Sequence, residues 1–328
     1  MKTRVYISED TNPYHNLAVE EYLLHLAEEN ECILYLWQNR RTVVIGRNQN
    51  ALKECKAHLL ESEGGFLARR LSGGGCVYHD LGNLNFTFIA KEHDYSIDRQ
   101  LSVIIKALET YGLNCEKTGR NDICIDEKKF SGNAFYKHMN RCYHHGTILV
   151  DVDLNEMSRY LNVSAEKLKA HSISSVKSRI VNLKSLNDKI CISGLQSALI
   201  QAFCEIYAQH RDILPEELDS SQISQLTEKY ASCEWRFGKS MEADYTMERR
   251  FPWGEVSILL KLKGNTVADV RVYSDALEGE LAETIISCLT GAAFERDELM
   301  QAVAQAQEKL SPEIQQDIIC LIKNQELW

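Results

Sequence analysis

The segment that most restricts this chain is a run of three glycines, Gly73–Gly75, between two strand-like apolar runs. Glycine adopts positive φ angles without steric cost and lets the backbone approach a ligand closely. Successive backbone N–H groups in such a turn can form an anion-binding nest. Arg69 and Arg70 precede the glycines, and a guanidinium group matches a carboxylate or phosphate. We therefore expect an anion-binding loop, with a flexible hairpin loop as the alternative.

Two common phosphate-binding motifs are absent from the sequence. A Walker A loop has the pattern Gly-x-x-x-x-Gly-Lys-Ser/Thr, but Cys233 stands where the first glycine before Gly238-Lys239-Ser240 would have to be. The sequence also contains no Gly-x-Gly-x-x-Gly. A phosphate site in this chain must therefore be of another kind.

A second polar segment, residues 119–122, precedes a strand-like run that begins with Lys128 and Lys129. A lysine at the start of a strand is usually solvated, but one that points into a cleft can act on a ligand oxyanion as a point charge. Asn121 and Asp122 are candidates to hold a metal ion or to orient that lysine. Turn residues are equally expected at these two positions.

Two further segments carry polar side chains. A zinc site of Cys142, His144 and His145 would fit no standard ligand spacing, which favours a hydrogen-bonded structural histidine pair. The segment 171–182 combines small hydroxyl residues with Lys177 and Arg179. It suggests a mobile polar loop that closes over a phosphate, with an ordinary surface loop as the alternative.

Composition excludes several classes of protein. The chain of 328 residues has 37 Lys and Arg against 47 Asp and Glu, a net charge of −10 that argues against a nucleic-acid-binding domain. Its first residues lack the apolar core of a secretory signal, and no run approaches the roughly 18 apolar residues that span a bilayer. The 11 cysteines include no Cys-x-x-Cys pair. We therefore expect reduced thiols and a cytoplasmic protein without membrane or nucleic-acid partners.

Hydrophobic periodicity predicts a larger mixed α/β domain and a small α+β domain, with a boundary near residues 238–247. Asn12-Pro13 is typical of a helix start, and the alternation on both sides of Lys263-Gly264-Asn265 predicts a hairpin over 256–272. Other strands are expected at 32–37 and 42–45, paired as a hairpin, at 66–70, at 84–89, and three times within 122–150. Other helices are expected at 50–61, around 101–108, at 154–170, 194–208 and 215–231, and from the hairpin to the end.

Taken together, these segments resemble the lipoate–protein ligase family. The resemblance is dense over about residues 1–240, and residues 235–238 with the hairpin at 254–273 look like the family's accessory domain. It implies a biotin/lipoate-ligase catalytic domain over 1–243, with a mixed sheet and flanking helices similar to class II aminoacyl-tRNA synthetases, and an accessory domain over 244–328. The matching stretches are RRLSGGGCVYHDLGNLNFTF at 69–88, GRNDI at 119–123, KFSGNAF at 129–135, HHGTILV at 144–150, LWQNRRTVVIGRNQN at 36–50 and SVKSRIVNL at 175–183.

The resemblance implies a ligase that works in two steps. Free (R)-lipoate and Mg²⁺-ATP give lipoyl-AMP and pyrophosphate, and a lysine of an apo lipoyl domain then takes the lipoyl group. The implied acceptors are the acyltransferase subunits of 2-oxoacid dehydrogenases and the glycine cleavage H protein. Because two anions must meet in the first step, positive charge and N–H donors have to offset their repulsion, and Mg²⁺ would neutralise the phosphates.

The resemblance also implies roles for individual residues. Lys129 would be the catalytic residue that bridges the lipoate carboxyl group and the α-phosphate, and Arg70 would help to bind both lipoate and nucleotide. The 171–182 loop would cover the adenylate and exclude water. The metal ligands stay unassigned. The residues implied to bind ATP or lipoyl-AMP are Arg70, Ser72, Gly73, Gly74, Gly75, Cys76, Val77, Tyr78, His79, Asn121, Asp122, Lys129, Lys177 and Arg179.

Three alternatives remain open at this stage. An acyl-carrier-dependent octanoyl or lipoyl transferase of the same fold needs a nucleophilic cysteine. Cys124 lies near one expected position, but its apolar neighbours favour a buried thiol. A biotin ligase would share the fold but has a different glycine loop. A non-catalytic paralogue would bind lipoate or a lipoyl domain without forming an adenylate, and the intact Arg70, glycine loop and Lys129 argue against it. Cys76 has no explanation.

Overall fold

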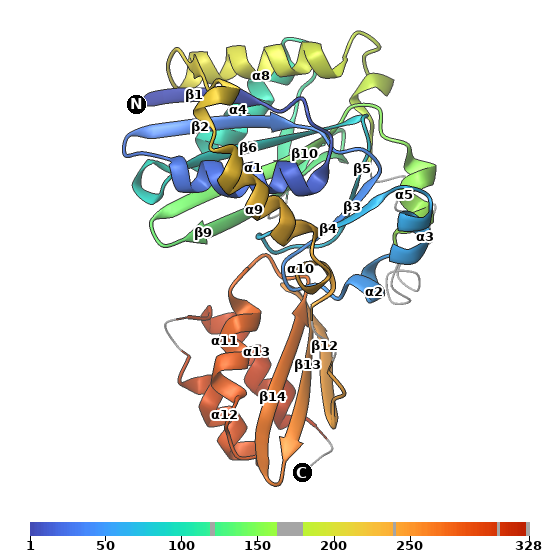
Figure 1. The fold of residues 1–328 in the computed structure, drawn as a ribbon, viewed down its shortest axis with the longest axis vertical. Coiled ribbons are helices and arrows are strands. Elements are labelled where there is room, and N and C mark those ends of the chain that lie inside the picture. The colour runs from blue at the N-terminus through green and yellow to red at the C-terminus, as the bar shows by residue number, and fades with distance from the viewer. Residues whose placement is uncertain (119–121, 163–179, 239–240, 307–308, 326–328) are drawn as a thin grey trace. The chain divides into compact units, whose positions relative to one another are not determined.

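The computed structural model describes residues 1–328 except 119–121, 163–179, 239–240, 307–308 and 326–328 (Figure 1). The described chain forms two compact units. Unit 1 contains Met1–Val44, Leu52–Arg69 and Cys76–Arg236, and unit 2 contains Ile45–Ala51, Arg70–Gly75 and Phe237–Trp328. Within the described residues, no helix is long and apolar enough to cross a membrane.

Unit 1 is built on an eight-stranded mixed sheet with the strand order β11-β1-β2-β6-β10-β9-β8-β7. Strand β1 runs parallel to its neighbours β2 and β11, and the remaining pairs are antiparallel. The three strands expected within 122–150 are confirmed as β8, β9 and β10. The bounds are β1 Lys2–Ile7, β2 Glu31–Trp37, β6 Asn83–Lys91, β7 Glu116–Thr118, β8 Asp122–Ile125, β9 Lys128–His138, β10 Arg141–Leu149 and β11 Arg211–Asp212.

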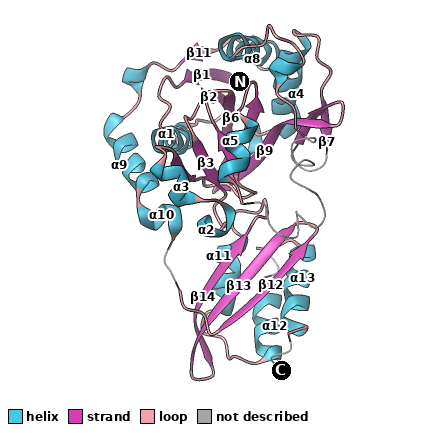
Figure 2. Cartoon of the chain, turned by 90° about the vertical axis from the view of Figure 1, so that its right-hand side faces the viewer, coloured by secondary structure: helices cyan, strands magenta, loops and turns pink. Residues whose placement is uncertain are grey.

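Helices cover both faces of this sheet (Figures 1 and 2). Helices α4 (Ile97–Glu109) and α8 (Ile192–Ile206) cover one face, where the alternating Leu84, Phe86 and Phe88 of β6 join them in one apolar core. Helices α1 (Pro13–Leu26) and α9 (Ser220–Ala231) lie together over the other face. The predicted start of α1 is confirmed, since the Asn12 side chain accepts a hydrogen bond from the backbone N–H of Tyr14.

A second sheet of unit 1 has the order β4-β3-β5, with β3 Thr42–Ile45, β4 Phe66–Arg69 and β5 Val77–His79. The predicted hairpin between 32–37 and 42–45 is therefore wrong, because β2 lies in the large sheet and β3 in the small one. Asn39, fully buried between these strands, hydrogen-bonds with Asn16 and His79. The connection from β2 to β3 is therefore a crossing between the two sheets and not a tight turn.

The remaining helices of this region are shorter than predicted. The helix expected at 50–61 is interrupted at Cys55 and Lys56, and Lys56 donates its backbone N–H to the carbonyl of Tyr160. The helix expected at 154–170 ends at Tyr160, and residues 163–170 lie outside the described part. The observed bounds are α2 Ala51–Glu54, α3 Ala57–Ser62, α5 Leu154–Tyr160 and α10 Cys233–Phe237, with single 3₁₀ turns at Glu92–Asp94, Leu183–Ser185 and Pro215–Glu217.

Unit 2 packs three helices on one face of a three-stranded antiparallel sheet (Figure 2). The predicted hairpin is confirmed as β13 (Gly254–Lys263) and β14 (Thr266–Ser274), and the sequence pattern missed the edge strand β12 (Tyr245–Phe251). The alternating inward residues of these strands form a separate apolar core with the helices. The helices are α11 Leu281–Leu289, α12 Arg296–Ala304 and α13 Pro312–Lys323.

Two segments from early in the chain belong to unit 2. Ser274 donates its backbone N–H to the carbonyl of Asn48 at 2.9 Å, and Gly74 donates its N–H to the carbonyl of Ala276 at 2.8 Å. The Asn48 side-chain amide donates to the Gly279 carbonyl at 3.0 Å. The glycine run is thus held by the segment that follows β14. A single domain boundary along the sequence cannot describe this arrangement, because unit 2 contains segments from early and late in the chain. The boundary between residues 243 and 244 stays a prediction.

Candidate active site

Lys129 and Asp122 form an ion pair at the start of β9, with 2.7 Å between Nζ and Oδ1. Strand β8 brings them together because Asp122 pairs with Gly132 across the ladder, and a register shift in β8 adjusts the position of the lysine. A Cβ atom on Gly132 would lie 2.9 Å from Nζ of Lys129, so the lysine side chain lies across this glycine. About a third of each side chain of the pair is exposed, which leaves the ammonium group accessible to a ligand.

Next to this pair, the sheet face under α1 carries a row of buried polar groups. The Glu20 carboxylate in α1 accepts hydrogen bonds from Thr87 of β6 at 2.7 Å and from Nδ1 of His145 of β10 at 2.8 Å. The indole N–H of Trp37 in β2 donates to the Thr87 hydroxyl at 3.1 Å. Buried polar groups of this kind are stable only when they are paired. We call this row the polar face.

His144 points to the opposite face of the sheet from His145, because successive residues of a strand alternate. Its Nε2 lies 2.8 Å from the amide oxygen of Asn133, and its Nδ1 lies 3.1 Å from the amide group of Gln100 in α4. Burial, with a smaller contribution from His145, lowers the pKa of His144 to about 3. The histidine pair is therefore hydrogen-bonded, as expected. Among the described residues, the group with the spacing of metal ligands is Glu29, His93 and Asp94.

The glycine loop of unit 2 is braced by Arg70. The guanidinium of Arg70 donates to the hydroxyl of Ser72 at 3.0 Å and to the carbonyls of Gly73 and Gly75, each at 2.7 Å. The structural reason for a glycine differs among the three positions. Gly74 has a φ of +89°, and a Cβ on Gly73 would lie 2.4 Å from the carbonyl oxygen of Ala276. A Cβ on Gly75 would meet nothing within 4 Å among the described residues, so packing there does not require a glycine.

The residues after the glycines return to unit 1 through β5. Cys76 is half-buried, with its thiol 3.7 Å from a carboxylate oxygen of Glu54. Burial raises the pKa of Tyr78 to about 12. His79 lies 3.1 Å from the side-chain amide nitrogen of Asn39 and meets the edge of the Trp37 ring, so it adjoins the polar face. Arg69 donates to the carbonyl oxygens of Trp235 and Arg236, which attaches β4 to α10.

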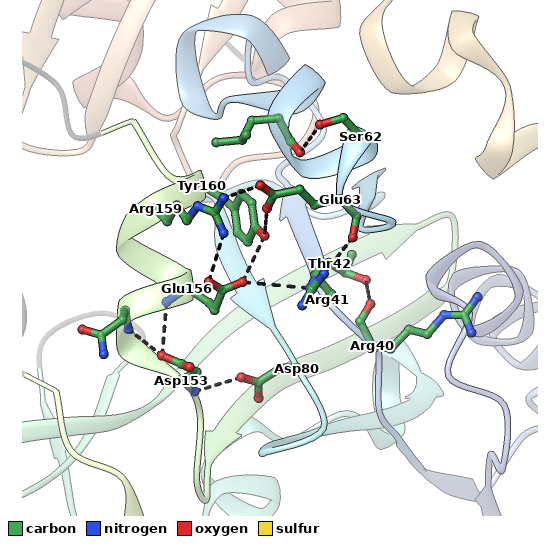
Figure 3. Close-up of polar contacts among 12 residues, drawn as sticks. Arg40, Arg41, Thr42, Ser62, Glu63, Asp80, Asp153, Glu156, Arg159 and Tyr160 are labelled. Atoms are coloured by element: carbon green, nitrogen blue, oxygen red, sulfur yellow. Dashed lines mark hydrogen bonds and ion pairs between the residues drawn. The ribbon is translucent and has the colours of Figure 1, made fainter.

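A cluster of charged side chains fixes α5 against α3 (Figure 3). The Tyr160 hydroxyl lies between the carboxylates of Glu63, at 2.5 Å, and Glu156, at 3.0 Å. Arg159 pairs with both of these carboxylates, and Asp153 caps the N-terminus of α5. The Tyr160 ring also stacks at an angle on Tyr78, with 5.9 Å between centroids. Through the contact between Tyr160 and Tyr78, the cluster therefore packs against β5.

The structure brings part of the predicted site together. Asp122 joins Lys129, and Arg70 joins Ser72 and the glycines, while Asn121, Lys177 and Arg179 lie outside the described residues. Cys124 is buried in β8, with its sulfur 2.9 Å from the Thr118 hydroxyl. No motif in the sequence predicted the polar face. One signal in the sequence was Glu20, a charged residue next to the apolar Val19 and near Leu23 in the helix that begins at Pro13.

Comparisons with known proteins identify the family and the fold. Residues 12–204 match the model of the lipoyl protein ligase A/B catalytic domain, and residues 240–322 match that of the bacterial lipoate protein ligase C-terminus. The chain is 40% identical over 308 residues to lipoate-protein ligase A of Psychrobacter cryohalolentis, which covers 91% of each chain. It is also similar to the crystal structure of P. falciparum LipL1 in complex with lipoate, with a TM-score of 0.86, 25% identity and 99% of each chain covered.

Two shorter solved proteins match less of this chain. One is lipoate-protein ligase A bound with ATP, at 28% identity and a TM-score of 0.63, which covers 73% of this chain and 99% of the other. The second is a bi-partite lipoate protein ligase, solved with its E2 lipoyl domain, from Thermoplasma acidophilum. It has 28% identity and a TM-score of 0.64, and the match covers 74% of this chain and 98% of the other.

These matches show that the protein is a ligase. It has a mixed α/β catalytic domain of the biotin/lipoate-ligase fold and a small C-terminal domain. This confirms the fold class and the enzyme class expected from the sequence motifs. The chain belongs to the lipoate–protein ligase family.

Proposed function

We propose that the protein activates free lipoate with Mg²⁺-ATP and transfers the lipoyl group to a lysine of an apo lipoyl domain. The observation that carries this proposal is the Lys129–Asp122 pair, which holds an accessible ammonium group in a fixed position over Gly132. In support, one similar solved ligase is bound with ATP and another is in complex with lipoate.

In the first step, a lipoate carboxylate oxygen attacks the α-phosphorus of ATP, a P–O bond forms, and pyrophosphate leaves. Both reactants are anions, so their approach costs electrostatic energy unless positive charge stands between them. Lys129 supplies this charge, and Asp122 fixes its direction before the substrates arrive. The N–H groups of the glycine loop add donors for the phosphates, with Arg70 keeping the loop rigid.

The residues present fit a magnesium ion, which prefers oxygen ligands and commonly uses one or two carboxylates together with substrate phosphates. Asp122 offers such a carboxylate, partly exposed and beside the reacting ammonium group. We propose Asp122 as the residue that would hold Mg²⁺. The ion would neutralise phosphate charge and stabilise the leaving pyrophosphate.

We place the lipoyl chain along the polar face, beside the small residues of β9. Gly132 and Ala134 alternate onto the face that also carries Lys129 and His145, and small side chains leave space next to a strand. The carboxyl end would then meet Lys129, and the far end would approach His145 and Trp37. The aromatic and polar groups there would fix the orientation of the chain.

In the second step, the amine of the acceptor lysine attacks the carbonyl carbon of lipoyl-AMP. A C–N bond forms, the bond from carbon to the phosphate oxygen breaks, and AMP leaves while the amine loses a proton. Lys129 would remain beside the carbonyl oxygen and stabilise its developing negative charge. We propose lipoyl domains of 2-oxoacid dehydrogenase acyltransferases and the glycine cleavage H protein as acceptors. A similar ligase solved with its E2 lipoyl domain supports this choice, and the free cysteines support a location in the cytoplasm.

The first test is isotope exchange between pyrophosphate and ATP. We expect exchange that requires both free lipoate and Mg²⁺, because the adenylate forms reversibly before transfer. Biotin is the control substrate and should support no exchange. Absence of exchange with lipoate, together with lipoyl or octanoyl transfer from an acyl carrier without ATP, would contradict the proposal and favour a transferase.

A further inference from the structure

A second set of reactive side chains lies at the edge of the large sheet, away from Lys129. The sulfur of Cys204, in the last turn of α8, is 3.0 Å from Nδ1 of His210. On the other side of the same ring, Nε2 of His210 is 3.1 Å from a carboxylate oxygen of Asp212. A thiol, an imidazole and a carboxylate in this order are the arrangement that activates a nucleophile.

The backbone holds this arrangement firmly. After α8 ends at Ile206, the chain turns back within four residues and forms β11, which pairs with β1. The Thr3 hydroxyl donates to the carbonyl of Gln209 at 2.6 Å, and Ile213 donates its N–H to the carbonyl of Val5 at 2.8 Å. These bonds fix the return of the chain, so that His210 is placed over the end of the helix that carries Cys204.

Charged and polar groups surround the His210 ring. Asp212 places a carboxylate oxygen against the far nitrogen of the ring. At the C-terminus of α8, Arg99 donates to the carbonyl of Ile206 at 2.7 Å. The neighbouring charges are already matched, Glu205 by Lys106 at 2.9 Å and Arg211 by Glu217 at 2.7 Å. Cys204 is half-buried, and the His210 side chain is 23% exposed, so a small reagent can reach the sulfur.

We propose that Cys204, His210 and Asp212 form an oxidation site at which the Cys204 thiol reacts with hydroperoxides to give a sulfenic acid. His210 takes the thiol proton at Nδ1, and Asp212 stabilises the resulting imidazolium. The sulfur then attacks one peroxide oxygen, so that an S–O bond forms and the O–O bond breaks. The departing alkoxide or hydroxide takes the proton from His210 and leaves as alcohol or water. The sulfur loses two electrons, and the peroxide gains them.

This site is separate from the proposed ligase chemistry. Strand β11 forms one edge of the sheet, and β9 with Lys129 lies towards the opposite edge. Oxidation of Cys204 therefore does not depend on adenylate formation, and each proposal can fail without the other.

The test uses the full chain with the Cys191→Ser change, because exposed Cys191 and Cys204 fall on the same tryptic peptide. The protein is treated with hydrogen peroxide at pH 7 in the presence of dimedone, which traps sulfenic acids, and the adducts are followed by mass spectrometry. Cys320 is the internal reference, since it is also half-buried but its sulfur contacts the amide of Asn324 instead of an imidazole.

We expect Cys204 to form the adduct at least about tenfold faster than Cys320, in line with the effect of a positioned general base. His210→Gln should bring the rate close to that of Cys320, and Asp212→Asn should cause a smaller loss. Lys129→Ala should leave the rate unchanged. Equal rates at Cys204 and Cys320, or an unchanged rate in His210→Gln, would overturn the proposal. If His210→Gln does not fold by circular dichroism, the exposed Asp212 variant decides, and an unchanged rate there overturns it.

Discussion

At the scale of single residues, the pairing with Asp122 holds Lys129 in place for the role proposed above. A lysine on a flexible side chain loses much rotamer freedom when it is held in one position. The ion pair with the Asp122 carboxylate already restricts the lysine side chain before a ligand binds, so less rotamer entropy is lost on binding. Gly132 leaves the space in which the lysine lies. The sequence motif that contains Lys129 and Gly132 thus has a physical basis in one contact.

Removal of the Asp122 charge should slow adenylate formation. In Asp122→Asn the amide no longer orients the ammonium or holds a cation, and we expect a fall of about tenfold or more in kcat for pyrophosphate exchange. Asp126→Asn is the matched control, because Asp126 is exposed in the adjacent turn at a positive φ that asparagine tolerates. Wild-type exchange in Asp122→Asn would contradict the role of this pair.

His144 should make the stability of the protein depend on pH. An unfolded imidazole ionises near pH 6.5, but the buried His144 has a pKa of about 3. Its contribution is therefore complete above about pH 6.5 and is lost as the pH falls towards 3. By pH 5 the loss should be about 2 kcal/mol. In His144→Gln, denaturant unfolding at pH 7 and pH 5 should show a smaller difference than in wild type or in the control His138→Gln, whose residue is exposed. Equal differences in all three would contradict the account.

At the scale of elements, two glycines of the glycine loop are expected to have different roles, Gly73 in packing and Gly75 in ligand binding. Gly73→Ala places a methyl group against the Ala276 carbonyl and should destabilise the protein by about 1–3 kcal/mol in denaturant unfolding. In Gly75→Ala the new methyl group meets no atom of the described residues within 4 Å, so stability should stay unchanged. The new methyl group would instead occupy the space where phosphates approach, and pyrophosphate exchange should fall by up to about 10²-fold. Full exchange in Gly75→Ala would show that the nucleotide binds elsewhere.

Local patterns predicted some of these elements and failed for others. The alternation of Leu84, Phe86 and Phe88, and the cap at Asn12, report local geometry, and both are confirmed. The partners of β3 are not encoded locally, because β4 and β5 come from later in the chain and not from the preceding strand β2. Strand β12 was missed because most of its residues are polar and exposed, as expected for an edge strand.

The candidate site shows the same division between local and distant information. Arg70 and Lys129 could be predicted as site residues from the sequence because each lies in a short motif of characteristic residues. The polar face could not, since its residues come one each from α1, β2, β6 and β10 and meet only in the folded sheet. Sequence alone also suggested no brace on the glycine loop, where Arg70 binds carbonyl groups of its own segment.

At the scale of the whole molecule, the chain has two hydrophobic cores, and the glycine loop belongs to the unit that contains the C-terminal residues. The glycine loop is thus held in position by hydrogen bonds to residues about 200 positions later in the sequence, such as the bond from Gly74 to Ala276. The net charge of −10 provides no general attraction for an acidic acceptor. We therefore expect recognition of a lipoyl domain to depend on a local surface of this protein.

The most direct test of the central claim is the intact mass of an apo lipoyl domain after incubation with the protein, Mg²⁺-ATP and free lipoate. We predict a gain of one lipoyl group that requires ATP. Lys129→Ala should slow the gain by about 10²–10³-fold, while Lys128→Ala should not, because the adjacent Lys128 is exposed and lies outside the ion pair. Modification by Lys129→Ala at the wild-type rate would contradict the account.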